Sequence, residues 1–143
     1  MSELDYKILV YFVRYAEHIE YFTKYHFKGE LDIFRNRPRT PRVTMPKAIC
    51  LLFTYKLSEC AEYLSEELKS LHPEVPWEKI ANLRQTIITR EEGFFDPEAA
   101  WNVLTVELPV WDNACCSILA AHNPSFGEDV AKNHYPSRYA KQN

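Results

Sequence analysis

Apolar side chains recur at intervals of three and four residues in four long stretches of the chain. That spacing places them on one face of an α-helix, whereas a half-buried strand would alternate apolar and polar residues. The sequence therefore predicts helices over residues 4–27, 46–71, 77–90 and 97–121. The 143 residues suffice to bury one core, so we predict an all-α fold, an antiparallel bundle of four to five helices with short loops.

Glycine and proline mark the expected helix boundaries. Gly29 follows the first helix, and the next residues up to Pro46 include further prolines that restrict the backbone. We expect a loop with at most short turns there. Pro109 falls inside the fourth helix, where it removes one backbone hydrogen bond and predicts a kink.

The apolar periodicity ends near residue 122, which predicts two parts of the chain. Residues 1–122 form the helical bundle domain, and residues 123–143 form an irregular C-terminal tail. Within the tail we expect a short helix around Glu128 to Asn133, docked on the bundle or on a partner.

Five cations and no acid lie between residues 35 and 47. They are Arg35, Arg37, Arg39, Arg42 and Lys47. The formal net charge is -3, and without these five the chain keeps 12 of its 17 basic residues against 20 acids. Such asymmetry indicates an anionic partner such as RNA, and a solvated basic loop without a ligand is the alternative.

Signals of several other protein classes are missing from the sequence. Cys50 and Cys60 lie on one predicted helix, roughly 15 Å apart at helical rise, which is too far for a disulfide. Paired CxxC spacing and the Glu-x-x-His motif of di-iron bundles are both missing, so we expect no metal and no cofactor. The first residues do not resemble a signal peptide, and no apolar run looks long enough to span a bilayer, so we expect a cytoplasmic protein.

Arg84 stands within the apolar pattern of the third predicted helix, next to or on its buried face. One interpretation is a binding residue; the other is a structural arginine paired with a core carboxylate such as Glu59. His26 and His72 are each candidates for a functional base. The alternatives are a packed histidine at a helix end for His26 and a loop residue for His72.

A set of markers occurs in one order along the second half of the chain. They are Glu59, Pro76, Trp77, Ile80, Arg84, Phe94, Phe95, Asp96, Trp101, Leu108 and Pro109. Together with the first helix, this order resembles the HepT-like branch of the HEPN families, the small helical proteins of prokaryotic toxin–antitoxin modules. The resemblance covers about residues 4–119.

This resemblance implies a HEPN-like bundle that forms a homodimer, with a metal-independent ribonuclease site in the cleft between subunits. The family site is an arginine, four spacer residues, a histidine, one more residue and a tyrosine. An arginine can hold the scissile phosphate while a histidine moves the proton of the ribose 2′-hydroxyl. The partner in this branch is a minimal nucleotidyltransferase antitoxin that adenylylates the tyrosine.

The chain departs from that motif at two of its three positions. Arg84 matches the arginine, but Thr89 stands at the histidine position and Glu91 at the tyrosine position. Loss of a general base typically costs about 10² to 10⁴ in rate, and the neighbouring Arg90 stays protonated. We therefore predict a degenerate site. Glu91 is either a solvated residue or a fixed negative charge that imitates the modified tyrosine.

The sequence thus predicts a HepT-like protein that works with a nucleotidyltransferase and binds RNA or nucleotide without efficient cleavage. Two alternatives stay open. One is an active toxin ribonuclease in which His72 or another residue supplies the base. The other is a non-catalytic interaction module similar to the substrate-binding subunits of small nucleotidyltransferases.

Overall fold

The computed structural model describes residues 1–36, 41–87 and 96–132, and within these ranges it contains helices and turns but no strand. Its elements are α1 Glu3–Tyr21, η1 Phe22–His26, α2 Leu31–Asn36, α3 Pro41–Tyr63, α4 Glu66–Leu71, α5 Trp77–Ala81, α6 Leu83–Ile87, α7 Pro97–Asn102, η2 Val103–Glu107, α8 Leu108–His122 and α9 Phe126–Ala131. The helical, bundle-like fold predicted from the apolar spacing is therefore confirmed.

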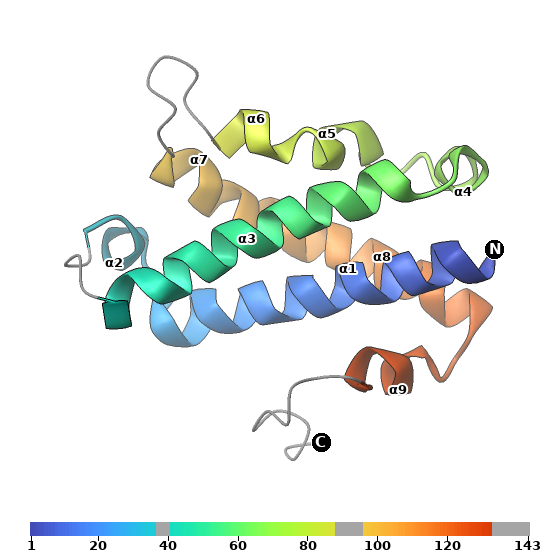
Figure 1. Ribbon diagram of the computed structural model, residues 1–143, viewed down its shortest axis with the longest axis horizontal. Coiled ribbons are helices and arrows are strands. Elements are labelled where there is room, and N and C mark those ends of the chain that lie inside the picture. The colour runs from blue at the N-terminus through green and yellow to red at the C-terminus, as the bar shows by residue number, and fades with distance from the viewer. Residues whose placement is uncertain (37–40, 88–95, 133–143) are drawn as a thin grey trace.

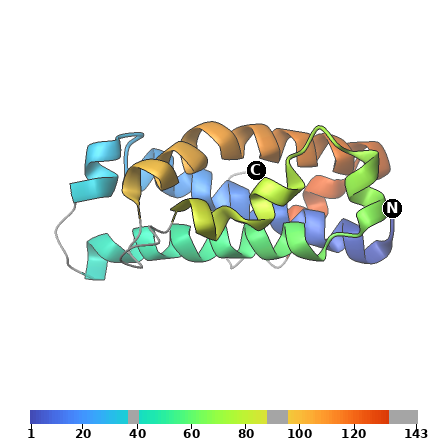
Figure 2. The same ribbon diagram turned by 90° about the horizontal axis from the view of Figure 1, so that it is seen from above.

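The long helices lie side by side along one direction (Figure 1). α1 runs away from the N-terminus, and α3 returns beside it in the opposite direction (Figure 1). The α5–α6 segment reverses the direction again. The last segment, α7 followed by η2 and α8, runs in the same direction as α3 (Figures 1 and 2). α9 lies against α1 on the side away from α5 and α6 (Figure 1). Because neighbouring helices alternate in direction, short connections suffice to join them.

The first helix begins and ends at residues that favour those boundaries. The Ser2 side chain accepts a hydrogen bond from the Asp5 backbone N–H and so caps α1. α1 continues into the π-helical turn η1, after which Lys28 and Gly29 take positive φ angles of 52° and 68°. The Gly29 N–H bonds the Thr23 carbonyl at 2.8 Å, a pattern that terminates helices, as predicted for Gly29.

The prediction of a loop between Gly29 and Pro46 was wrong for the residues before and after 37–40. Residues 31–36 form the short helix α2, and α3 begins at Pro41 rather than at Pro46. Proline is compatible with a first helical position because its missing N–H has no intrahelical partner there. Pro46 lies five residues further on and forfeits one bond, to the Arg42 carbonyl, which the rest of this 23-residue helix tolerates.

The second and third predicted helices are each broken once. The second ends at Tyr63, because the Ser65 side chain accepts a hydrogen bond from the Leu68 N–H and starts α4 as a new helix. The Asp5 carboxylate holds this break from α1, accepting bonds from the Ser65 N–H at 2.9 Å and the Ser65 hydroxyl at 2.6 Å. The third is interrupted at Asn82 between α5 and α6.

The interruption predicted at Pro109 takes the form of a π-helical turn. η2 spans Val103–Glu107, and the Leu108 N–H bonds the Val103 carbonyl five residues back. The proline ring would otherwise press against the carbonyl of Thr105, four residues earlier, and the wider turn relieves that crowding. The fourth predicted helix therefore continues from α7 into α8 and keeps its direction along the bundle (Figure 1).

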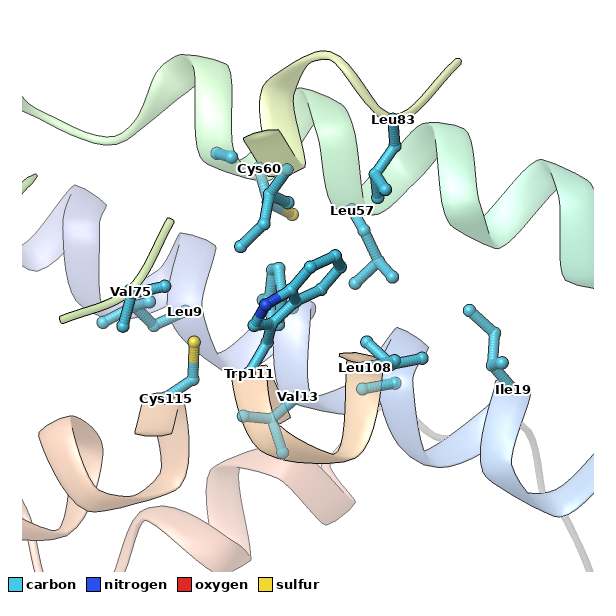
Figure 3. Packing of buried hydrophobic residues seen from close by; sticks show 14 of the residues in the cluster. Leu9, Val13, Ile19, Leu57, Cys60, Val75, Leu83, Leu108, Trp111 and Cys115 are labelled. Atoms are coloured by element: carbon cyan, nitrogen blue, oxygen red, sulfur yellow. The ribbon is translucent and has the colours of Figure 1, made fainter. Parts of the chain in front are cut away.

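Trp111 of α8 fills the centre of the core. Its indole lies among Leu57 and Cys60 of α3, Leu108 and Val13 (Figure 3), and it is 4% exposed. Cys50, Cys60 and Cys115 are buried and Cys116 is half-buried, all of them free thiols. Burial raises the pKa of Cys60 to about 12, so this thiol behaves as a small apolar residue.

The short tail helix α9 is held on α1 by a buried arginine. Arg14 is 9% exposed. Its guanidinium donates to the backbone carbonyls of Val130 at 3.0 Å, Asp129 at 2.8 Å and Lys132 at 2.7 Å. These carbonyls close α9, so a positive charge there also satisfies the helix C-terminus. The helix predicted at Glu128–Asn133 is found at Phe126–Ala131 and docks on the bundle.

Candidate functional site

Arg84 is an exposed residue of α6 beside the core rather than inside it. Its neighbour Leu83 and Ile80 of α5 are both 0% exposed, so the apolar face predicted for this segment is correct. The Arg84 side chain points to the solvent-exposed side. Glu59, the proposed core partner, instead pairs with Lys56 at 3.3 Å. No ion pair joins Arg84 to another of the described residues.

The other two positions of the motif, Thr89 and Glu91, lie outside the described residues. The same holds for Arg37 and Arg39 of the basic stretch. Arg42 lies in the first turn of α3, but its side chain is outside the described part of the chain. The roles of these residues stay predictions.

The two remaining cations of the basic stretch take part in packing on helices instead of extending from a loop. Arg35 of α2 forms an ion pair with Glu98 of α7. Lys47 of α3 lies with its ammonium 5.1 Å from the ring centre of Phe34, and burial lowers the pKa of Lys47. Both side chains therefore help to hold α2 in place, and these contacts within the chain compete with contacts to RNA phosphates.

Neither candidate histidine is brought to Arg84. His72 ends α4, with its Nδ1 atom 3.3 Å from Glu74 and its carbonyl accepting a bond from the Trp77 indole at 3.0 Å. The whole of α5 lies between it and α6 (Figure 1). His26 ends η1 and packs against Phe22 at 5.1 Å between ring centres. His26 is thus a packed histidine at the end of a helical turn, and His72 is a residue of the connection after α4.

A group of three carboxyls, which the apolar patterns did not reveal, lies where α1 meets α8. Asp112 is only 7% exposed, Glu20 is half-buried and Glu17 stands at the exposed edge. The Asp112 carboxyl lies near Glu20 of α1, and the Cys116 thiol donates to Asp112 at 3.8 Å. Burial, followed by repulsion from Glu20 and Glu17, raises the pKa of Asp112 to about 7.

A cavity of about 430 Å³ borders this carboxyl group. Glu20, Lys24 and Trp101 line it together with Thr105 and Pro109. Both π-helical turns contribute, since Lys24 belongs to η1 and Thr105 to η2. π-helical turns are often found at functional sites, and the volume lies within the range of small-molecule pockets.

Two broader properties bear on the kind of site the chain offers. Within residues 1–36, 41–87 and 96–132, no group of three or more His, Cys, Asp or Glu residues is arranged to hold a metal ion. The helical run from Pro97 to His122 has the length and the mean hydropathy, 1.3, of a membrane-spanning helix, contrary to the expectation from the sequence. It is 44% buried, and core helices of soluble proteins share these properties, so it is weak evidence for a membrane protein.

Comparison of the chain with family models, with curated proteins and with solved structures gave no match in any of the three. The functional interpretation therefore rests on the sequence markers and on the geometry around Arg84.

Proposed function

We propose that this protein is a degenerate HepT-like HEPN protein that works with a minimal nucleotidyltransferase in a two-component, toxin–antitoxin type module. Its role in this proposal is to bind RNA or nucleotide in a cleft between two copies of the chain. The observation that supports it is Arg84: an exposed guanidinium without an acidic partner among the described residues, on the helix that leads toward the other motif positions.

The chemistry available at this site favours binding over cleavage. A guanidinium presents two parallel N–H donors to a phosphate and is always protonated. RNA cleavage also needs a group that takes the proton of the 2′-hydroxyl near neutral pH, and a threonine hydroxyl does not do so. The homodimer and the four- to five-helix HEPN form of the bundle belong to the same proposal.

The position of His72 disfavours the active ribonuclease as an alternative. A base must come within hydrogen-bonding reach of the proton it removes, and α5 separates His72 from Arg84 in one subunit. The non-catalytic substrate-binding subunit shares the nucleotidyltransferase partner but depends on the basic stretch. Replacing Arg37, Arg39 and Arg42 together would abolish binding in that case and would leave Arg84 unimportant.

The proposal predicts that Arg84→Ala weakens binding of single-stranded RNA by at least about tenfold, because one charge-assisted phosphate contact is worth about 1.5–3 kcal/mol. Fluorescence anisotropy of a labelled oligonucleotide at fixed salt measures this. Gln85→Ala, at the neighbouring exposed position of α6, is the matched control and should bind as the wild type does.

Equal affinity of wild type and Arg84→Ala would contradict a binding role for the arginine. Cleavage of the RNA by the wild-type protein in the presence of a chelator, abolished by Arg84→Ala, would contradict the degenerate site and restore the ribonuclease interpretation.

A further inference from the structure

The outer side of the last long helical segment is poor in charge. α7, η2 and α8 run along the edge of the bundle opposite α3 (Figure 2). No lysine or arginine occurs between residues 91 and 131. Glu107 and Asp112 are the acids between residues 99 and 127; Glu107 pairs with Lys79, and Asp112 is only 7% exposed. Because the solvent side of a surface helix normally carries charged residues, this side needs another explanation.

Uncharged, exposed residues follow one another along that side at intervals of three and four, the spacing that places residues on one face of a helix. We call them the outer stripe: Asn102, Val106, Val110, Asn113, Ser117 and Ala121. The side chains of Val106 and Val110 are apolar and 60% and 65% exposed. Within residues 1–36, 41–87 and 96–132 nothing covers the outer stripe, since each of its members is exposed.

The spacing of the outer stripe is the same in both directions along the chain. Its intervals are four, four, three, four and four residues. Two identical copies laid antiparallel about the midpoint of the stripe therefore bring Val110 of one copy opposite Asn113 of the other. Val106 likewise lies opposite Ser117. Each valine then faces a smaller side chain, so the stripe is complementary to a second copy of itself.

We propose that the outer stripe is the surface through which two copies of this chain associate, antiparallel and related by a two-fold axis. Identical uncharged surfaces meet without like-charge repulsion, and the centres of protein interfaces are depleted in charged residues. α6, which carries Arg84, packs against α7 at the start of the same helical segment. The inference rests on the proposed function, which needs a cleft between two copies of the chain, and it names the surface that joins them.

Other binding partners fit the chemistry of this surface less well. RNA needs cations, and the outer stripe has none. A lipid surface favours an apolar face flanked by lysine or arginine, whereas Asn102, Asn113 and Ser117 are polar. Burial of one face in the core and of the other face in a dimer explains why Pro97–His122 combines a mean hydropathy of 1.3 with only 44% burial in the single chain.

The length of the outer stripe sets the expected strength of association. At a rise of 1.5 Å per residue the stripe spans about 29 Å from Asn102 to Ala121. Contact between two helices over this length lies near the lower end of the range of stable interfaces, about 1,200 Å² in total. We therefore expect a reversible dimer with a dissociation constant in the micromolar range.

Sedimentation equilibrium of the purified chain, without RNA and without another protein, measures this association. The wild type should pass from monomer to dimer over micromolar concentrations. Val110→Glu should weaken the dimer at least about tenfold, because it places two carboxylates near the two-fold axis. Leu52→Glu is the matched control: Leu52 is 52% exposed on α3, at the opposite edge of the bundle, and its replacement should leave the association unchanged.

Mixing two variants separates the interface from an effect on folding. Val110→Glu and Val110→Lys should each be mostly monomeric, and their mixture should dimerise, because the opposite charges then attract across the axis. Arg84→Ala should dimerise as the wild type does, so RNA binding and association fail in different measurements. A dimer that Val110→Glu leaves unchanged would overturn this interface without touching the role of Arg84. A monomeric wild type that binds phosphatidylcholine vesicles through Val110 would overturn it in favour of a lipid surface.

Discussion

Replacing Thr89 with His and Glu91 with Tyr together is expected to raise metal-independent RNA cleavage by about 10² to 10⁴-fold over the wild type. The double variant supplies the two groups that the HepT-like motif has beyond its arginine. Histidine adds a base that changes its charge near neutral pH, while Arg84 already stands exposed on α6 to hold the phosphate. Cleavage of a labelled RNA in the presence of a chelator measures the gain, and growth arrest on expression reports it in cells.

Two further variants make that result interpretable. Adding Arg84→Ala to the double variant should remove the gained activity, because the phosphate would lose its cationic partner. Thr89→Asn with Glu91→Phe introduces side chains of comparable shape without a base or a hydroxyl and should stay inactive. A folded double variant that cleaves no faster than the wild type would contradict the idea that Thr89 and Glu91 alone silence the site.

Arg14→Met is expected to release α9 from the bundle, because the docking of α9 becomes less favourable by about 2–4 kcal/mol. Three backbone carbonyls of the α9 end accept bonds from this 9% exposed guanidinium, and methionine leaves them without a donor. Tyr6 still donates to Asp129 at 2.5 Å and Val130 stays buried, but neither contact supplies a donor to the three carbonyls. Hydrogen exchange over residues 126–132 and limited proteolysis of the tail measure the release.

The control for this change is Lys7→Met, which removes a cation from the exposed part of α1. Lys7 pairs only with Glu3, at 3.2 Å, so its loss should leave the protection of α9 unchanged. Unaltered exchange over residues 126–132 in Arg14→Met would show that apolar contacts such as those of Val130 hold the helix by themselves.

The positions of the main helices could be predicted because each buries one apolar face with a regular spacing. Leu83, Ile80 and Trp111 are buried as the periodicity of their segments indicates. The breaks at Ser65 and Asn82 were not predicted, since a single capping side chain or a local turn interrupts a helix without disturbing its apolar pattern. Pro41 falls in the segment predicted to be a loop, but it opens α3, because proline is also compatible with a first helical position.

Polar contacts between distant parts of the chain were beyond sequence reasoning. Asp112 meets Glu20 only because α8 packs on α1, and Arg14 meets the end of α9 only because the tail folds back. Arg35 was predicted to bind an anion, but Glu98 of α7 supplies one within the chain. Side chains of this kind have no periodic signal, because their partners are fixed by tertiary packing rather than by neighbours in sequence.

The most direct measurement for the proposed two-component module is the identity of the protein that co-purifies with this chain. The tagged chain is expressed together with the gene adjacent to its own, purified without crosslinking, and analysed by mass spectrometry and by light scattering for stoichiometry. We expect a minimal nucleotidyltransferase in a fixed ratio with a dimer of this chain. Recovery of the chain alone, or with a partner that has no nucleotidyltransferase domain, would contradict the proposal.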